Sequence, residues 1–412
     1  MTPLANLKVL DLGKVIAGPI CGQWLGDLGA DVVKVEPVIT GDDTRAWPPY
    51  SSGESAMFLA FNRNKRSLAV DMKTPEGRDI VHRLAKQSDI VIQGFGAGAA
   101  KRLGVDYETL SALNSRLIYC EISGYGRSGP LGDLPGYDVM IQAFSGMIST
   151  MGVEDGPLVR VSFSPIDQST GMHALSGIMA ALIERGKTGK GAFLEVSLFE
   201  TAMGLLGYMA SSFWQGGERP RKMGSGHSTL CPYQAFEAAD GALLLAIGND
   251  GQWQRFCDLA GMPELKTDDR FSTNKARVAN FKATVERVAA EISCDTVANW
   301  VERLSHVKVP CSPVNTLMDA LQHPQTDARQ IVVRQDHAKL GEIRTIAYPV
   351  TFNGKKAEAR MAPPMLGQHT FEILRDLGFD NNSLSDLVSR GIVAGPDVAS
   401  YLNKPADHQP AH

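Results

Sequence analysis

Short apolar runs alternate with segments of helical spacing over the first 125 residues of the chain. The apolar runs are rich in Val, Ile and Leu, as is typical of strands that are buried on both faces. They predict strands at residues 7–12, 30–36, 66–71, 89–92 and 117–123. The helical spacing between them predicts helices at residues 20–28 and 74–87, with Gly29 and Pro75 at their boundaries. This alternation predicts a parallel sheet covered by helices, a Rossmann-like α/β domain.

The segment at residues 161–183 has a different pattern, because small and apolar residues occupy nearly every position after Gly171. A helix of this composition is expected to be buried on all sides. Asp167 is the one charged residue of the segment, and Ser164-Pro165 before it is typical of a helix start. An aspartate at this place can cap the helix or act as a carboxylate in a site at its N-terminus, and the local sequence leaves both open.

The chain after residue 198 predicts a last helix of the large domain, a linker and a second, smaller domain. Residues 199–214 predict one long helix, and the polar residues 215–223, which include Gly and Pro, predict a linker. The smaller α+β domain is expected at residues 224–309. Its expected elements are strands at 233–237 and 242–246 and helices at 250–260 and within 275–304. Asp250 is the expected cap of the first helix, and the segment T-N-K-A-R (273–277) is expected to open another with a Thr or Asn cap.

A second linker, residues 310–330, contains a short helix at 317–322 and leads back to the large domain at residues 331–402. Strand-like alternation follows at residues 331–352, and residues 371–377 predict a last short helix. The large domain is therefore expected in two parts, residues 1–214 and 331–402. Residues 403–412 are expected to be a disordered tail.

The composition excludes several classes of function. A net charge of −4 with a pI near 6.2, and no cluster of Lys or Arg, argue against a nucleic-acid partner. The sequence shows no apolar run long enough to span a membrane and no leader, so we expect a cytoplasmic protein. The six cysteines form no C-x-x-C pair, which argues against a structural metal site or a disulfide framework. The first strand–helix junction lacks G-x-G-x-x-G, so a dinucleotide cofactor is not supported.

Several segments, in a fixed order along nearly the whole chain, resemble the class III CoA-transferases. This family includes the formyl-CoA:oxalate and carnitine CoA-transferases and the α-methylacyl-CoA racemases. The resembling segments are L-D-L-G-K-V-I-A-G-P (10–19), L-G-A-D-V-V-K-V-E (28–36), G-D-D-T-R (41–45), N-K-R-S-L-A-V-D-M-K-T-P-E-G (64–77), G-Y-D-V-M-I-Q-A-F-S-G (136–146), R-G-K-T-G-K-G (185–191) and P-P-M-L-G-Q-H-T (363–370). The resemblance implies a large Rossmann-like domain and a smaller domain, joined by linkers, in an interlocked homodimer.

The resemblance implies that Asp167 is the catalytic nucleophile. Its carboxylate would attack an acyl-CoA thioester to give a mixed anhydride, and the CoA thiolate would then form an aspartyl-CoA thioester. Covalent catalysis of this kind divides one acyl exchange into easier steps. Such a nucleophile should be ionised, which a helix N-terminus favours and full burial opposes. Coenzyme A would be a substrate, and neither a permanently bound cofactor nor a metal is implied.

The resemblance also implies positions that contact CoA. They are Ile16, Val70, Lys73, Phe95, Arg102 and Tyr137, with Lys73 and Arg102 near phosphates, Phe95 near adenine and Tyr137 near the thioester. The chain departs from the family pattern at Pro37, where many members carry Arg, and at Gly94, where several carry Asn. Both departures put the phosphate and adenine contacts in question.

A glycine-containing stretch, Gly224, Ser225, Gly226 and His227, matches the loop with which the family covers its nucleophile. Glycines let a backbone close on an intermediate and donate N–H groups, although a linker end would also contain them. The sequence after this stretch looks closest to the branch that moves CoA from succinyl-CoA to dicarboxylic acids. A distal carboxylate needs a cation or several donors, for which Arg45, Arg160 and His227 are the candidates.

Two alternatives stay open beside the transferase. Racemases of the family carry His in G-H-D, whereas this chain has Gly136-Tyr137-Asp138, and tyrosine is a poor base near pH 7. This favours the transferase over a racemase. A non-catalytic CoA-binding protein would not need Asp167.

Overall fold

The computed structural model describes residues 2–217 and 219–396, so the expected disordered tail lies outside the described residues. The chain forms two compact units. Within the described residues, the larger unit takes in residues up to 145, residues 161–207 and residues from 325 onward, and the smaller unit takes in residues 146–160 and 208–324. These limits differ from the expected domains, because residues 146–160 group with the smaller unit and the junction at 207–208 falls within the expected helix 199–214.

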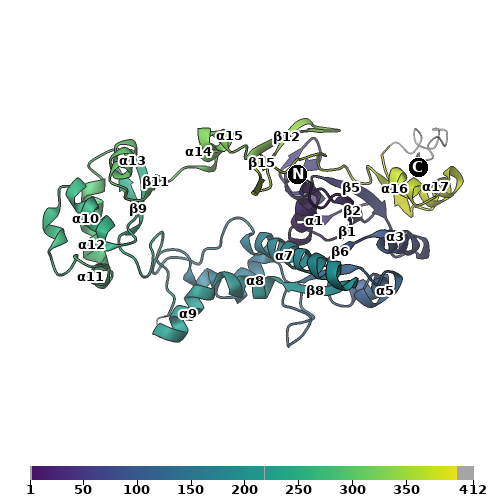
Figure 1. The fold of residues 1–412 in the computed structure, drawn as a ribbon, viewed down its shortest axis with the longest axis horizontal. Helices are drawn as coiled ribbons and strands as arrows, with labels where there is room; N and C mark the ends of the chain where they lie inside the picture. Colours follow the sequence, from purple (N-terminus) through teal and green to yellow (C-terminus); the bar gives the residue numbers. More distant parts are fainter. Residues whose placement is uncertain (1, 218, 397–412) are drawn as a thin grey trace. The chain divides into compact units, whose positions relative to one another are not determined.

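A seven-stranded sheet forms the centre of the larger unit (Figure 1). Its spatial order is β16 (Val393–Ala394), β5 (Lys65–Val70), β2 (Asp31–Glu36), β1 (Lys8–Leu12), β6 (Ile90–Gln93), β7 (Ile118–Ser123) and β8 (Ala192–Ser197). All neighbouring strands are parallel except β16, which is antiparallel to β5. The chain winds from β1 through β2 to β5 on one side and from β6 through β7 to β8 on the other. The strand order therefore reverses between β1 and β6, and open α/β sheets bind ligands at the carboxyl ends of the strands at such a point.

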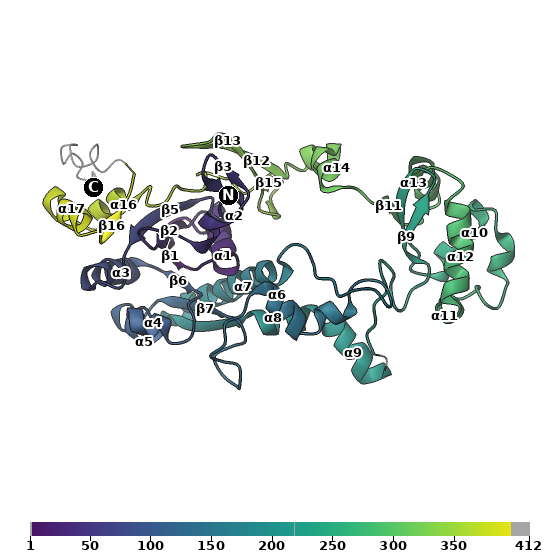
Figure 2. The ribbon, with the colours of Figure 1, turned by 180° about the vertical axis from the view of Figure 1, so that it is seen from behind.

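Helices cover both faces of this sheet. Alternate side chains of β1, β2, β5 and β6 pack against α3 (Pro75–Gln87), α5 (Tyr107–Leu113), α16 (Thr370–Asp376) and α17 (Asn381–Ser389). The other face is covered by α1 (Ala17–Asp27) and α7 (Pro165–Thr188), which lie side by side in Figures 1 and 2. The expected α/β architecture with a parallel sheet is thus observed, and α17 and β16 are elements that the sequence did not reveal.

Helix α7 crosses α1 at close range. A Cβ atom on Gly171 would lie 2.3 Å from Cγ2 of Ile20 and 2.8 Å from the carbonyl oxygen of Ala17, so only glycine fits there. The expectation that this helix is buried on all sides is wrong for the single chain, because Met172 and Ile183 are 46% and 66% exposed. Only the sides that face α1, α6, α8, β7 and β8 are covered.

The expected long helix at residues 199–214 is two helices, α8 (Leu198–Leu205) and α9 (Gly207–Gly216). Gly204 and Gly207 flank the break, and glycine disfavours a continuous helix because it loses the most backbone freedom. The junction between the two compact units falls directly after this break.

The remaining elements of the larger unit are short. They are the 3₁₀ helix η1 (Asp43–Ala46), β3 (Tyr50–Ser51), β4 (Glu54–Ser55), α2 (Ala56–Phe61), α4 (Ala99–Leu103), α6 (Asp138–Phe144), β12 (Val332–His337), β13 (Gly341–Ile346), β14 (Thr351–Phe352) and β15 (Lys355–Lys356). Within the described residues, no helix is both long enough and apolar enough to cross a membrane.

The smaller unit has an antiparallel sheet in the order β11, β10, β9, packed against helices. Its elements are the 3₁₀ helices η2 (Met147–Thr150) and η3 (Pro263–Lys266), β9 (Tyr233–Ala238), β10 (Gly241–Ala246), α10 (Asp250–Leu259), α11 (Asn274–Ala279), α12 (Phe281–Ile292), α13 (Val297–His306), β11 (Cys311–Pro313) and α14 (Leu317–Gln322), and α15 (Pro324–Ala328) follows at the unit boundary. Trp253, Phe256 and Trp300 lie at the centre of its core.

A buried arginine ties this unit together. The guanidinium of Arg277 is fully buried and donates to the carbonyl oxygens of Cys231 (2.7 Å) and Phe271 (2.9 Å) and to the carboxylate of Asp250 (2.9 Å). Asp250 therefore binds Arg277 and does not cap α10, as the sequence had suggested; the cap is Asn249, whose side chain accepts from the N–H of Gln252. Of the expected Thr or Asn cap in residues 273–277, the structure has Thr273, whose hydroxyl accepts from the N–H of Ala276.

We predict that Arg277→Met lowers the stability of the smaller unit by about 2–4 kcal/mol, because two buried carbonyl oxygens lose their donors. Urea unfolding followed by tryptophan fluorescence measures the loss. Arg270→Met is the matched control, since Arg270 is exposed and bridges only Asp268. Equal midpoints for the two variants would contradict a stabilising role of Arg277.

Candidate active site

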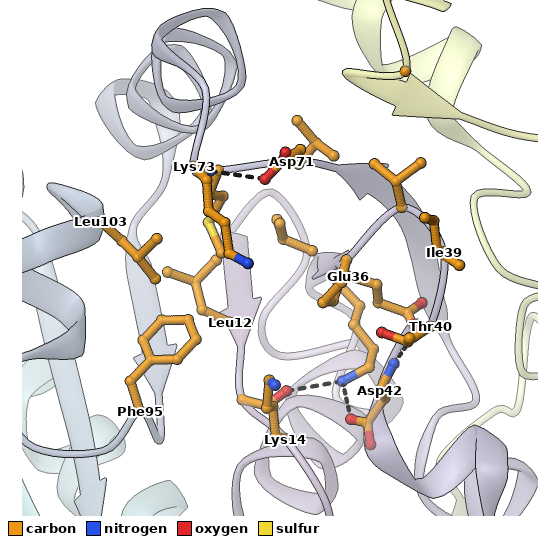
Figure 3. Close-up of a pocket in the computed structure, with 18 residues that line it drawn as sticks. Leu12, Lys14, Glu36, Ile39, Thr40, Asp42, Asp71, Lys73, Phe95 and Leu103 are labelled. Atoms are coloured by element: carbon orange, nitrogen blue, oxygen red, sulfur yellow. Dashed lines mark hydrogen bonds and ion pairs between the residues drawn. The ribbon is translucent and has the colours of Figure 1, made fainter.

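Two cavities lie at the reversal point of the sheet. The first, about 470 Å³, lies at the carboxyl ends of β1, β2, β5 and β6 and is here called the sheet-edge cavity (Figure 3). The second, about 230 Å³, contains Asp167 in its wall and is here called the Asp167 cavity. Lys14 and Phe95 line both cavities. The two cavities therefore adjoin at these two residues.

Asp167 differs from every other buried acidic side chain among the described residues. Six acidic side chains are buried there, and five have a cation or hydrogen-bond donors on their carboxylates. The partners are Lys65 for Asp11, Arg63 for Asp27, Arg45 for Glu36, Lys34 for Asp42 and the N–H groups of α7 for Asp138. Asp167 is 9% exposed, and no hydrogen bond to its carboxylate occurs within the described part of the chain. A buried carboxylate without a partner is costly, which makes Asp167 a candidate functional group.

Burial, and then the negative charge of Asp138, raise the pKa of Asp167 to about 7. Burial and the like charge therefore oppose the ionisation that the helix N-terminus favours, so this carboxylate is only partly ionised at neutral pH in the unliganded chain. The alternative reading of Asp167 as the helix cap is wrong. Ser164, at the N-cap position of α7, makes no capping bond, and the carboxylate of Asp138 accepts the N–H groups of Ile166 and Asp167.

The loop between β1 and α1, which lines both cavities, is held by three buried charges. The N–H of Gly13 donates to Asp11 (2.8 Å), and the carbonyl oxygen of Gly13 accepts from the ammonium of Lys34 (2.9 Å). The N–H of Val15 donates to Asp42 (3.3 Å), and Lys34 and Asp42 form an ion pair at 2.8 Å. Burial raises the pKa of Asp42, but Lys34 and the hydrogen bonds outweigh it and lower the pKa to about 2. The loop is thus fixed before any ligand arrives.

Val15 adopts a left-handed backbone conformation with φ of 66°. This conformation is rare for a β-branched side chain and costs roughly 1–3 kcal/mol. Strain of this kind persists only where the surroundings enforce it, and here the bond to Asp42 does so. Val15 lines the Asp167 cavity directly before α1, and the first residues of that helix, Ala17 and Gly18, line the same cavity. The strained residue therefore lies at the turn that leads into the helix.

Most residues expected to contact CoA line one of the two cavities. Val70 and Lys73 line the sheet-edge cavity, Ile16 and Tyr137 line the Asp167 cavity, and Phe95 lines both. In Figure 3 the ammonium of Lys73 and the ring of Phe95 point into the sheet-edge cavity. Arg102 is exposed on α4 and does not line either cavity. Of the two departures from the family pattern, Pro37 lines the sheet-edge cavity and Gly94 the Asp167 cavity.

Arg45, a candidate for reading a distal carboxylate, is engaged within the fold. Its guanidinium donates to both carboxylate oxygens of Glu36, at 2.6 and 2.8 Å, and lies 3.5 Å over the ring of Phe58. Glu36 is itself buried, so breaking this pair would leave its carboxylate without a counter-charge, with only the N–H of Asp42 and the hydroxyl of Ser67 as donors in the described part of the chain. The assignment of Arg45 to a substrate acid is therefore corrected: it is a structural cation.

The other two candidates lie in the smaller unit. His227 lines a cavity of about 520 Å³ together with Gly224, Gly226 and Arg221, and its Nδ1 accepts from the N–H of Thr229 (3.2 Å). The hydroxyl of Ser225 accepts from the N–H of Ala235 (3.1 Å), which ties this loop to β9. Arg160 is exposed.

Sequence reasoning missed four residues of the site. Lys14 and Asp138 stand inside quoted family segments but were given no role. Arg127 lines the Asp167 cavity, where its guanidinium binds the carboxylate of Glu121 and the carbonyl oxygen of Phe95. Gly391 reaches the sheet-edge cavity from the turn after α17, and no local signal in the sequence could have placed it there.

Comparisons with known proteins agree with this geometry. The sequence model of CoA-transferase family III matches residues 4–370. The succinyl-CoA:glutarate CoA-transferase of Mus musculus is 36% identical over 395 residues, 95% of this chain and 91% of the relative. The succinate–glutarate CoA-transferase of Agrobacterium fabrum is 37% identical over 390 residues, 91% of this chain and 96% of the relative. A crystal structure of a CAIB/BAIF family protein from Brucella suis has a TM-score of 0.81 and 38% identity, covering 91% of this chain and 99% of that one. The family resemblance and the fold class read from the sequence are confirmed.

We predict that Lys34→Met destabilises the larger unit by about 3–5 kcal/mol, because it leaves the buried carboxylate of Asp42 without its counter-charge. Urea unfolding followed by circular dichroism measures the change. Lys187→Met is the control, since Lys187 is exposed and, among the described residues, forms an ion pair only with exposed Glu184 at 3.6 Å. A loss no larger than that of the control would show that the buried pair does not hold the loop.

Proposed function

The chain belongs to CoA-transferase family III, and on this premise we propose that it moves CoA from succinyl-CoA to a dicarboxylic acid through covalent intermediates on Asp167. The observation that carries the proposal is the unpaired, buried carboxylate of Asp167 in a cavity that shares Lys14 and Phe95 with the sheet-edge cavity. A carboxylate held out of water is a stronger nucleophile than a solvated one, and water that would hydrolyse an activated intermediate is kept away.

The proposed reaction conserves one activated acyl bond at each step. A carboxylate oxygen of Asp167 attacks the thioester carbon of the donor, the C–S bond breaks, and a mixed anhydride and CoA thiolate result. The thiolate attacks the side-chain carbonyl of Asp167 and releases the donor acid, leaving an aspartyl-CoA thioester. The acceptor carboxylate attacks this thioester and displaces the thiolate, which then takes the acceptor acyl group and frees Asp167.

Coenzyme A enters this scheme as a substrate, and the two adjoining cavities support a site for it at the carboxyl ends of the strands. Lys73 and Phe95 would bind the nucleotide end in the sheet-edge cavity, with Val70 in its wall. The thioester end would pass Lys14 and Ile16 into the Asp167 cavity, where Tyr137 lies in the wall. Arg102, exposed beside Leu103, could reach only a phosphate outside the cavity.

The loop Gly224–His227 is the proposed lid, and His227 and Arg160 are the proposed cations or donors for a distal carboxylate. The positive φ of Gly224 (61°) supports the lid, because a side chain at this position would strain the turn. The named activities of the mouse and Agrobacterium relatives support succinyl-CoA and a dicarboxylic acid as the substrates.

An interlocked homodimer is also proposed. Its support is apolar surface on elements that the single chain leaves uncovered. Met172 and Ile183 on α7, Met203 on α8 and Trp214 on α9 are 46%, 66%, 38% and 72% exposed. The cytoplasmic location expected from the sequence stays a prediction.

We predict that Asp167→Asn lowers CoA exchange at least about 10³-fold, because a carboxamide does not form the anhydride. Exchange of labelled succinate into succinyl-CoA measures the loss, and hydroxylamine trapping of the wild type locates the adduct by mass spectrometry. Stability and CoA binding are expected to persist, since the carboxylate makes no hydrogen bond in the described structure. Asp269→Asn, the same change on an exposed aspartate, is the control.

Retained exchange in Asp167→Asn would overturn the nucleophile. Deuterium uptake from solvent at the acyl α-carbon, in place of CoA exchange, would indicate a racemase and contradict the transferase.

We predict that glutarate is a better acceptor than pentanoate by at least about 10-fold in kcat/KM, because a distal carboxylate gains charge-assisted hydrogen bonds that a methyl group does not. The two acids have the same number of carbons, so the pair isolates the second carboxylate. A mass-spectrometric screen with succinyl-CoA, acetyl-CoA and formyl-CoA as donors measures the preference. Equal use of the two acids would contradict a dicarboxylate acceptor.

A further inference from the structure

A second aspartate holds the first turn of the helix that carries Asp167. Asp138, the first residue of α6, is 5% exposed. Its Oδ2 accepts the N–H groups of Ile166 (2.8 Å) and Asp167 (3.0 Å). The first N–H groups of a helix have no intrahelical partner and are usually capped from the adjoining residues. Here the cap comes from a residue on another helix, so the placement of Asp167 depends on α6.

Gln142, one turn further along α6, completes the arrangement. Its side-chain amide donates to Oδ1 of Asp138 (2.5 Å), and its carbonyl oxygen accepts from the N–H of Val161 (3.0 Å). Gln142 is fully buried. The pair Asp138 and Gln142 therefore binds the segment before α7 at Val161 and again at Asp167.

We propose that Asp138 is a positioning residue for the transfer reaction: it fixes the backbone of Asp167 through its hydrogen bonds and places a negative charge at the same helix start. That charge adds to burial in making the Asp167 carboxylate more basic. The inference rests on the proposed role of Asp167 as nucleophile. A more basic carboxylate attacks a thioester more readily, and the cost is that more of it is protonated below neutral pH. Gln142 keeps the Asp138 carboxylate turned toward α7.

The surroundings of Asp167 contain few other charges that could produce the same effect. The titratable residues lining its cavity are Lys14, Asp43, Arg127 and Tyr137. Lys14 and Asp43 approach one another at 3.9 Å, and Arg127 is neutralised by Glu121. On the strands packed against α7, Glu195 of β8 binds the N–H of Arg127 and Glu121 of β7 binds its guanidinium, while Tyr119 and Cys120 of β7 are buried. On the helices, Glu200 of α8 binds Ser197, and Cys21 is buried in α1. Burial is the larger cause that raises the pKa of Asp167 to about 7, and Asp138 is the charge that adds to it.

The test compares the pH dependence of CoA exchange in the wild type and in Asp138→Asn. Asparagine keeps an oxygen that can accept from the backbone but removes the charge. For the wild type, kcat/KM should fall as the pH drops below about 7, because protonation removes the nucleophile. In Asp138→Asn this acid limb should move to lower pH by about 1 unit, and kcat on the alkaline plateau should fall about 10-fold.

An NMR titration of the Asp167 carboxyl carbon, assigned through its loss in Asp167→Asn, follows the same group without activity. The matched control is Asp106→Asn, which replaces the aspartate that caps α5 through Thr109. This control should leave the acid limb unchanged. An unmoved acid limb and an unmoved carboxyl titration in Asp138→Asn would overturn the proposal.

Gln142→Leu provides a second variant should Asp138→Asn fail to fold. It retains the Asp138 charge and removes the donor that orients it, so kcat should fall several-fold with no shift of the acid limb to lower pH. Wild-type kcat in folded Gln142→Leu would overturn the positioning role. CoA exchange that survives in Asp167→Asn would contradict the proposed function. Loss of exchange in Asp167→Asn, together with an unshifted acid limb in Asp138→Asn, would contradict only the role of Asp138.

Discussion

The burial of one carboxylate that has neither a cation nor a hydrogen-bond donor in the described chain is the constraint on which the site depends. Asp167 occupies this position because α7 crosses α1 where Gly171 permits close contact, and this packing removes the carboxylate from water. The larger unit pairs its other buried acids with cations or N–H donors, so the missing partner is not a general property of its core. The carboxylate of Asp167 is thus free to react with the electrophilic carbonyl carbon of a substrate.

The paired charges around the site have a different task. The loop that precedes α1 is held by Asp11, Lys34 and Asp42. The position of Asp42 is fixed in turn by Glu36, which accepts its N–H (3.0 Å) and pairs with Arg45. Buried ion pairs add little net stability, but they are intolerant of displacement. A loop that contains the strained Val15 needs such fixed partners, because a flexible loop would relax to an unstrained backbone and no longer line the cavity in the same way.

The same helix start is thus approached by two kinds of carboxylate. Asp138 accepts hydrogen bonds and stays fixed, whereas Asp167 accepts none in the described chain and is available for chemistry. Two acids with contrasting surroundings at one helix terminus are a familiar way of assigning one to structure and the other to reaction. The sequence motif Gly136-Tyr137-Asp138 contributes to both, since Tyr137 lines the cavity and Asp138 holds the helix.

The sequence by itself determined the elements and the family. Buried strands and capped helices leave local patterns, so β1, β2, β5, β6, β7 and α3 were predicted within about two residues, and ordered motifs along the chain identified the CoA-transferase family. Only the tertiary structure decided which carboxylates are paired. Asp42, Asp138 and Asp167 look alike in sequence, and Arg45 looks like a free cation, because hydrogen bonds between distant segments leave no local pattern. The reassignment of the α7 cap from Asp167 to Asp138 depended on a contact across 29 residues, which only folding brings together.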